Sequence, residues 1–197
     1  MIPIGLLITF DRFVHNQFLK QLGAFVHDSK QILDAWNLYS DAHTDLDGWP
    51  EDPHAYGLRQ SQRDGDTARA FEPLHAGARR LLTTAGTQLG VLPLSAVQSR
   101  WVYQVSILTD ALGRLDDLHE QWLRTRDTLP LNSGPGTPDY DDALAEYHAD
   151  AWSSLDDWAT HGLALSEIAA AARTAPSPLA PAPAVAATPG KRAAAGR

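Results

Sequence analysis

Histidines and carboxylates one helical turn apart are the residues of this 197-residue sequence whose types and spacing could do chemistry. His119 lies three positions after Asp116 and directly before Glu120, and His148 lies on an apolar stripe further along the chain. Carboxylate-x-x-His pairs on facing helices hold di-iron and di-manganese centres in helical bundles. Such a centre also needs glutamates from two further helices, and none lies in the middle of an apolar stripe. We therefore expect hydrogen-bonded histidines at the bundle edge, with a metal-binding bundle enzyme at Asp116, His119 and Glu120 as the third alternative.

The run Asp-Asp-Leu-His-Glu at residues 116–120 is similar to the DDxx(D/E) motif with which terpene synthases bind magnesium. Residues 150–157 are similar to part of the second metal motif of that family, but Ala149 stands in place of Asn or Asp, and Asp157 in place of Glu. The two motifs also lie closer together than in that family, and the chain is too short for its usual domain. We therefore favour paired aspartates on the solvated face of a helix.

The junction between residues 86–91 and 95–101 resembles a helix-turn-helix, with a Leu-Gly-Val turn and a second helix that opens with polar residues. The resemblance implies base contacts from Gln98, Ser99 and Arg100, and phosphate contacts from Arg79 and Arg80. However, the connection is longer than the usual turn, and the second helix continues far beyond the length of a recognition helix. A helix-turn-helix-like DNA-binding regulator is therefore the first alternative function.

The elements that must position these side chains are two long seams of mostly apolar residues at alternating spacings of four and three. This spacing keeps one stripe of a helix against a partner helix, as in bundles and coiled coils. The first seam comprises Phe18, Leu22, Phe25, Ser29, Ile32, Trp36 and Tyr39, and the second comprises Trp101, Val105, Leu108, Leu112, Leu115, His119 and Trp122.

The predicted architecture is all-α: a bundle of four main helices, three long and one shorter, over residues 9–43, 67–88, 95–126 and 139–173. Residues 45–66 are rich in turn formers and are predicted to form a structured loop between the first two helices. Ser95 and Gln98 have the spacing of a capping box at the start of the third helix. We expect a bundle domain at residues 1–173 and a disordered Ala/Pro-rich tail at residues 174–197.

The composition limits the classes of function. The sequence contains no cysteine, which excludes disulfides and thiolate metal sites. The formal net charge is −8, and all acidic residues precede the basic tail, so the body of the protein is acidic. An acidic body disfavours non-specific binding to nucleic acid. No export signal or membrane-spanning segment is recognisable, and we expect a cytoplasmic protein that does not enter a membrane.

A bundle with one short helix would leave part of its seams uncovered, and such a stripe favours self-association or a partner helix. We therefore expect Trp36, Tyr39 and Trp101 to be exposed interaction anchors. The sequence shows no hydrolase triad, phosphate-binding glycine loop or HExxH motif. The main hypothesis is a non-enzymatic helical interaction or regulatory protein without a cofactor, whose partner is another protein or a second copy in a homodimer.

Overall fold

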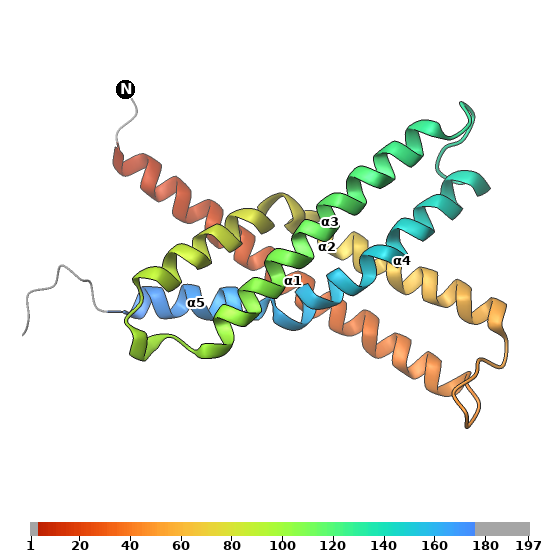
Figure 1. Ribbon diagram of the computed structural model, residues 1–197, viewed down its shortest axis with the longest axis horizontal. Helices are drawn as coiled ribbons and strands as arrows, with labels where there is room; N and C mark the ends of the chain where they lie inside the picture. The colour runs from red at the N-terminus through yellow and green to blue at the C-terminus, as the bar shows by residue number, and fades with distance from the viewer. Residues whose placement is uncertain (1–3, 176–197) are drawn as a thin grey trace, which may run out of the picture.

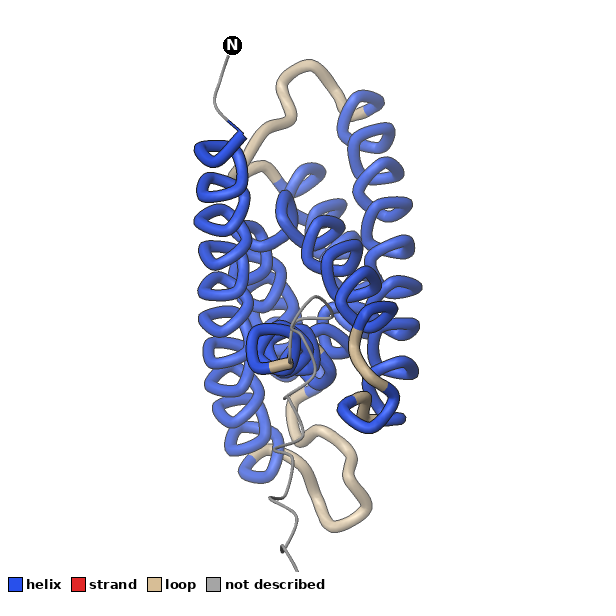
Figure 2. Tube along the Cα trace, turned by 90° about the vertical axis from the view of Figure 1, so that its left-hand side faces the viewer, coloured by secondary structure: helices blue, strands red, loops and turns tan. Residues whose placement is uncertain are grey.

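The computed structural model describes residues 4–175, with side chains from residue 12 onward, and this part of the chain is all-α. Its helices are α1 (Ile4–Ala42), α2 (Pro53–Val91), the short 3-10 turn η1 (Leu94–Ala96), α3 (Ser99–Thr128), α4 (Pro138–His161) and α5 (Leu163–Thr174). The side view in Figure 2 shows only helices and their connecting loops. The prediction of an all-α bundle of four main helices is confirmed, while the predicted tail at residues 174–197 lies almost entirely outside the described residues.

Two helical hairpins cross one another to form the body (Figure 1). In the first hairpin α1 packs along α2, and in the second α3 packs along α4. The hairpins meet mainly through α2 and α4, and α5 then runs back beside α2. On one side of the crossing the two hairpins diverge (Figure 1). On the other side the end of α2 and the start of α3 lie close together, and α5 contacts both helices.

The second helix is much longer than the sequence predicted. We expected residues 45–66 to be irregular and the helix to begin near residue 67, but α2 begins at Pro53 and spans 39 residues. Asp52 caps it by accepting hydrogen bonds from the backbone N–H groups of His54 and Ala55, both at 3.0 Å. Proline suits the first helical turn, where no N–H is needed, so Pro53 starts the helix. The connecting loop is therefore short, and a single bridge between Thr44 and Pro50 pins it.

The start of the third helix also differs from the prediction. Ser95 belongs to the short turn η1, and Gln98 is the N-cap residue of α3 without a side-chain capping bond. The predicted capping box is therefore wrong. Instead, the Gln98 side chain accepts a hydrogen bond from Nε of Arg100 at 2.8 Å.

The predicted fourth helix is divided at Gly162 into α4 and α5. A Cβ atom at this position would lie 2.5 Å from the carbonyl oxygen of Trp158 and 2.8 Å from Cδ1 of Leu22. Real Cβ atoms do not approach other atoms so closely, so glycine is what allows α1 to touch the chain at this bend. The break lets α5 leave the direction of α4 and cover α2.

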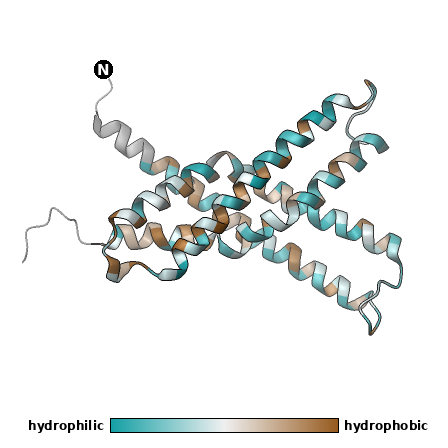
Figure 3. Cartoon of the chain, in the orientation of Figure 1, coloured by the Kyte–Doolittle hydropathy of each residue, from teal (hydrophilic) through white to brown (hydrophobic). Residues whose placement is uncertain are grey.

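Apolar side chains from all five helices form one core at the crossing. Phe71 of α2 lies at its centre, with its ring 5.1 Å from that of Phe25 and 5.4 Å from that of Trp158. Figure 3 shows hydrophobic positions distributed along every helix among hydrophilic ones, as expected of amphipathic helices. Among the described residues, no helix is long and apolar enough to cross a membrane.

Two of the three expected interaction anchors are not exposed. Trp36 is only 9% exposed, because the ring of Tyr56 and the guanidinium group of Arg63 pack against it. Trp101 is 3% exposed, and its indole N–H donates to Glu167 of α5 at 2.7 Å. The full-length α2 and the returning α5 cover the parts of the seams that a short second helix would have left open. Tyr39 is half-buried.

Candidate ligand-binding cavity

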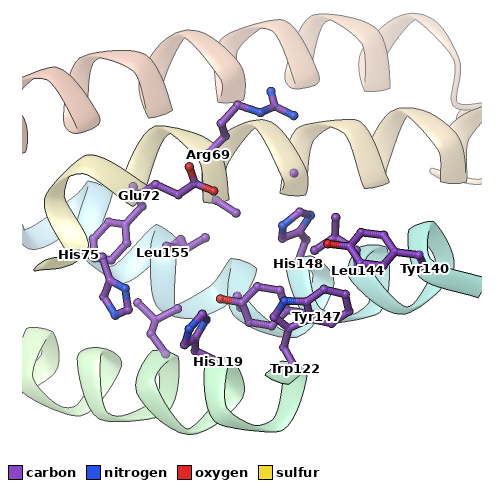
Figure 4. Close-up of a pocket in the computed structure, with 15 residues that line it drawn as sticks. Arg69, Glu72, His75, His119, Trp122, Tyr140, Leu144, Tyr147, His148 and Leu155 are labelled. Atoms are coloured by element: carbon purple, nitrogen blue, oxygen red, sulfur yellow. The ribbon is translucent and has the colours of Figure 1, made fainter. Parts of the chain in front are cut away.

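A cavity of about 370 Å³ lies between α2, α3 and α4, beside the crossing of the hairpins. Figure 4 shows that α2 forms one side, α3 the opposite side and α4 the back. The volume falls within the range of small-molecule sites in proteins. Its described lining combines aromatic, imidazole and aliphatic side chains with one acid and one arginine: Phe71, Trp122, Tyr140, Tyr147, His75, His119, His148, Leu115, Leu144, Leu155, Glu72 and Arg69, beside Gly65, Ala68 and Ala151.

Flat aromatic surfaces make up the end of the cavity formed by α3 and α4. The rings of Trp122 and Tyr147 are stacked at a centroid distance of 5.9 Å and an interplanar angle of 16°. Tyr140 meets Trp122 edge-on at 5.3 Å. Because aromatic faces favour other flat rings, this end suits a planar group.

An ion-pair network between α2 and α3 lies next to the cavity, beside His75. His75 of α2 contacts Asp116 of α3 through Nε2 and Oδ1 at 3.1 Å, and Arg79 binds the other carboxylate oxygen of Asp116. These contacts tie α2 to α3 across the cavity. They also orient the imidazole of His75, whose ring lies 6.1 Å from that of His119.

Five polar side chains that line the cavity have no hydrogen-bond partner within the part of the chain that the structure describes: Glu72, His119, Tyr140, Tyr147 and His148. Figure 4 shows them arriving from all three helices. Polar groups in a partly enclosed site are normally paired by protein or by water. These five therefore remain available to bind a molecule in the cavity.

The protonation states of two of these groups follow from their surroundings. Burial lowers the pKa of His148 below its ordinary value of 6.5; the positive charge of Arg69 lowers it further, whereas Glu72 acts in the opposite direction. Burial, followed by the negative charge of Glu72, raises the pKa of Tyr147 above 10.0. At neutral pH, His148 is therefore an uncharged imidazole that can accept or donate, and Tyr147 is a phenol that can donate.

A glycine on α2 makes room for the histidine of α4. A Cβ atom at Gly65 would lie 3.3 Å from Nδ1 of His148, closer than ordinary van der Waals contact. The absence of a side chain at Gly65 thus allows the imidazole of His148 to lie against α2 at the edge of the cavity.

The structure separates the three residues predicted to bind a metal. His119 lines the cavity, but Asp116 is bound by His75 and Arg79, and Glu120 is exposed and lies 3.7 Å from Arg124. Within residues 12–175 no three histidine, cysteine or acidic side chains are grouped so that they could hold a metal ion. The metal prediction itself stays untested.

The residues predicted to contact DNA do not form one basic surface with free side chains. Arg100 pairs with Glu167 at 2.8 Å, and Arg79 pairs with Asp116. Gln98 and Ser99 are exposed at the start of α3, and Arg80 is exposed on α2. DNA binding also stays an untested prediction.

The sequence analysis placed His119, Leu115 and Trp122 on the second seam and His148 on a further apolar stripe, and all four line the cavity. It did not identify Tyr140, Tyr147, Glu72 or His75 as members of the cavity. The available signal was the unusual density of aromatic and imidazole residues at positions 140–148.

No protein-family model matches this chain, and searches of the curated proteins and of the solved structures find no similar protein.

Proposed function

We propose that this protein binds a small, planar, polar organic molecule in the cavity between α2, α3 and α4. The observation that carries the proposal is the set of five cavity-lining polar side chains without a hydrogen-bond partner in the described residues. Glu72 and His119 are exposed at the cavity, and Tyr140, Tyr147 and His148 are half-buried, so all five can exchange water for a ligand. A ligand that pairs them would gain hydrogen bonds and apolar contacts together.

The lining also favours one chemical class of ligand. The stacked rings of Trp122 and Tyr147 favour a flat ring system. Uncharged His148, protonated Tyr147 and the carboxylate of Glu72 favour donors and acceptors on the edge of that ring. We therefore propose a hydroxylated or nitrogen-containing aromatic compound.

Binding rather than catalysis is the proposed role of the cavity. This role agrees with the non-enzymatic regulatory protein that the sequence predicts, because a ligand held by α2, α3 and α4 would stabilise the crossing of the two hairpins. Such a ligand would then bias any interaction that depends on the angle between them.

Native mass spectrometry of the untagged protein, purified without a chelator, is the first test. A retained organic mass would identify a natural ligand directly, whereas extra mass equal to one or two metal ions would favour the metal alternative. Saturation-transfer NMR with hydroxyquinoline and hydroxyindole fragments is the second test. We expect these fragments to bind the native protein, and Tyr147→Phe, which removes one hydrogen bond, to weaken binding about fivefold.

The matched control is Tyr103→Phe. Tyr103 is 67% exposed on α3, outside the cavity, and its loss of a hydroxyl should leave fragment binding unchanged. Equal affinity of all three proteins, or no binding to the native chain, would contradict the proposal.

Self-association is a second candidate function, supported by four exposed apolar or aromatic side chains around the connection from α2 to α3. Val91, Leu94, Val102 and Tyr103 are 59–93% exposed. Sedimentation velocity over a concentration series tests whether a dimer forms. We expect Leu94→Glu to shift a dimer toward monomer. The control is Leu131→Glu in the loop between α3 and α4, which should leave the dimer unchanged. A native protein that stays monomeric would rule out this candidate.

A further inference from the structure

A second concave site lies between α1, α2 and α4 and shares no lining residue with the cavity described above. We call it the α1/α2/α4 groove; its volume is about 230 Å³. Val26, Ile32 and Leu33 of α1 and Ala159 of α4 supply apolar walls, and Trp152 of α4 adds an aromatic one. The groove is thus suited to a small hydrocarbon group.

One buried polar atom in this groove has no partner. Ser29 is 6% exposed and lines the groove, and its hydroxyl oxygen makes no hydrogen bond with any residue in the described ranges. A buried hydroxyl without a partner is unfavourable, and proteins seldom retain one without water or a ligand to satisfy it. Ser29 therefore points to an occupant with a hydrogen-bonding group.

The charges around the groove determine the sign of that group. Arg63 forms a buried ion pair with Asp64 at 2.6 Å, and Lys30 forms an exposed ion pair with Asp34 at 2.6 Å. Asp156, which is half-buried and also lines the groove, has no hydrogen-bond or ion-pair partner in the described part of the chain. The charge left without a partner at the groove is therefore negative.

We propose that the α1/α2/α4 groove binds a small aliphatic amine in its ammonium form. The ammonium group donates to the carboxylate of Asp156 and to the hydroxyl oxygen of Ser29, and the hydrocarbon chain packs between α1 and α4. A charged donor paired with a carboxylate forms a stronger hydrogen bond than a neutral pair, so the amine is favoured over an alcohol of the same size. The inference is independent of the proposed function of the larger cavity.

Isothermal titration with hexylammonium chloride tests this proposal, with hexanoate and hexan-1-ol as probes of equal chain length. We expect hexylammonium to bind the native protein and hexanoate not to bind. Asp156→Asn should weaken hexylammonium binding at least tenfold, and Ser29→Ala should weaken it about threefold.

The matched control is Asp150→Asn, which removes an exposed carboxylate from the same helix outside the groove. This variant should keep the native affinity, and thereby separate binding at the groove from general attraction to an acidic protein. The proposal is overturned if hexylammonium does not bind the native chain, if Asp150→Asn and Asp156→Asn weaken binding equally, or if hexanoate binds as well as the amine.

Discussion

Gly77 of α2 allows the ring of Phe18 of α1 to lie directly on the helix backbone. A Cβ atom added at Gly77 would overlap three atoms of that ring, Cγ, Cδ1 and Cε1. The residue is buried, and it lies one turn from Leu74 and Leu81 in the core. Gly77→Ala must therefore push Phe18 and α1 away from α2.

Two opposing contributions determine the effect of Gly77→Ala on the free energy of unfolding. Alanine is favoured over glycine in a helix interior by about 1 kcal/mol. Overpacking a well-filled contact costs about 1–3 kcal/mol. Phe18 is half-buried and can move partly toward solvent, so the cost should lie near the middle of that range. The expected net result is a destabilisation of about 1 kcal/mol, or a decrease in Tm of about 2–4 °C for a chain of this size.

Thermal and urea unfolding, followed by far-ultraviolet circular dichroism, measure this difference. The control is Gly86→Ala on the exposed side of the same helix, where a Cβ atom would meet no atom within 4 Å. Gly86→Ala has only the benefit of the higher helix propensity of alanine and should be more stable than the native protein by about 1 kcal/mol. The opposite signs of the two substitutions are what the structure predicts.

A double-mutant cycle isolates the role of Phe18. In a Phe18→Ala background the ring is absent, so Gly77→Ala should change sign and become stabilising. If Gly77→Ala stabilises the native protein as much as Gly86→Ala does, the contact between Phe18 and Gly77 is refuted, and with it the close packing of α1 on α2 at this point.

Two further predictions concern charged and titratable groups. Arg63→Leu leaves Asp64, which is 2% exposed, without its ion-pair partner, and should lower the free energy of unfolding in urea by about 3–5 kcal/mol. The double variant with Arg63→Leu and Asp64→Asn should lose less stability. Equal losses in the two variants would contradict a buried ion pair. Burial lowers the pKa values of His148 and His15 in the folded state, so the unfolded chain takes up protons first as the pH falls below about 6.5. The contribution of these two histidines to stability should therefore be constant above that pH and decrease below it. His148→Phe should reduce this acid-side loss in a series of melting curves, and an unchanged slope would show that the pKa of His148 is not lowered.

The helices could be predicted from the sequence because their burial follows a simple spacing rule. Leu22 and Phe25 of the first seam and Leu108 and Leu112 of the second are all buried. The spacing does not show whether the ends of the seams are covered, because burial there depends on which other element arrives. Trp101 is covered because α5 turns back at Gly162, and no local property of the sequence around Trp101 indicates this.

The true start of α2 was missed because its residues are typical of turns. Pro53, Gly57 and Gly65 all disfavour a helix interior when they are considered one at a time. In the structure, Pro53 is at the first turn, and Gly65 is buried against His148, so neither interrupts the helix. Packing against α1 and α4 thus outweighs local propensity over this segment, as it often does in long helices.

The position of the cavity follows from the crossing of the hairpins rather than from any single motif. His119 and His148 lie on the apolar stripes of α3 and α4, and where two helices simply pair, such stripe residues contact the partner helix or end at the edge of the bundle. Here α2 crosses both helices at an angle, so its residues Glu72 and His75 face the same stripes across a gap (Figure 4). The side chains of the three helices do not fill this gap, and several of its polar groups make no hydrogen bond with another described residue. The stripes determine which residues reach the cavity, but the crossing angle determines that there is a cavity, and only the structure shows that angle.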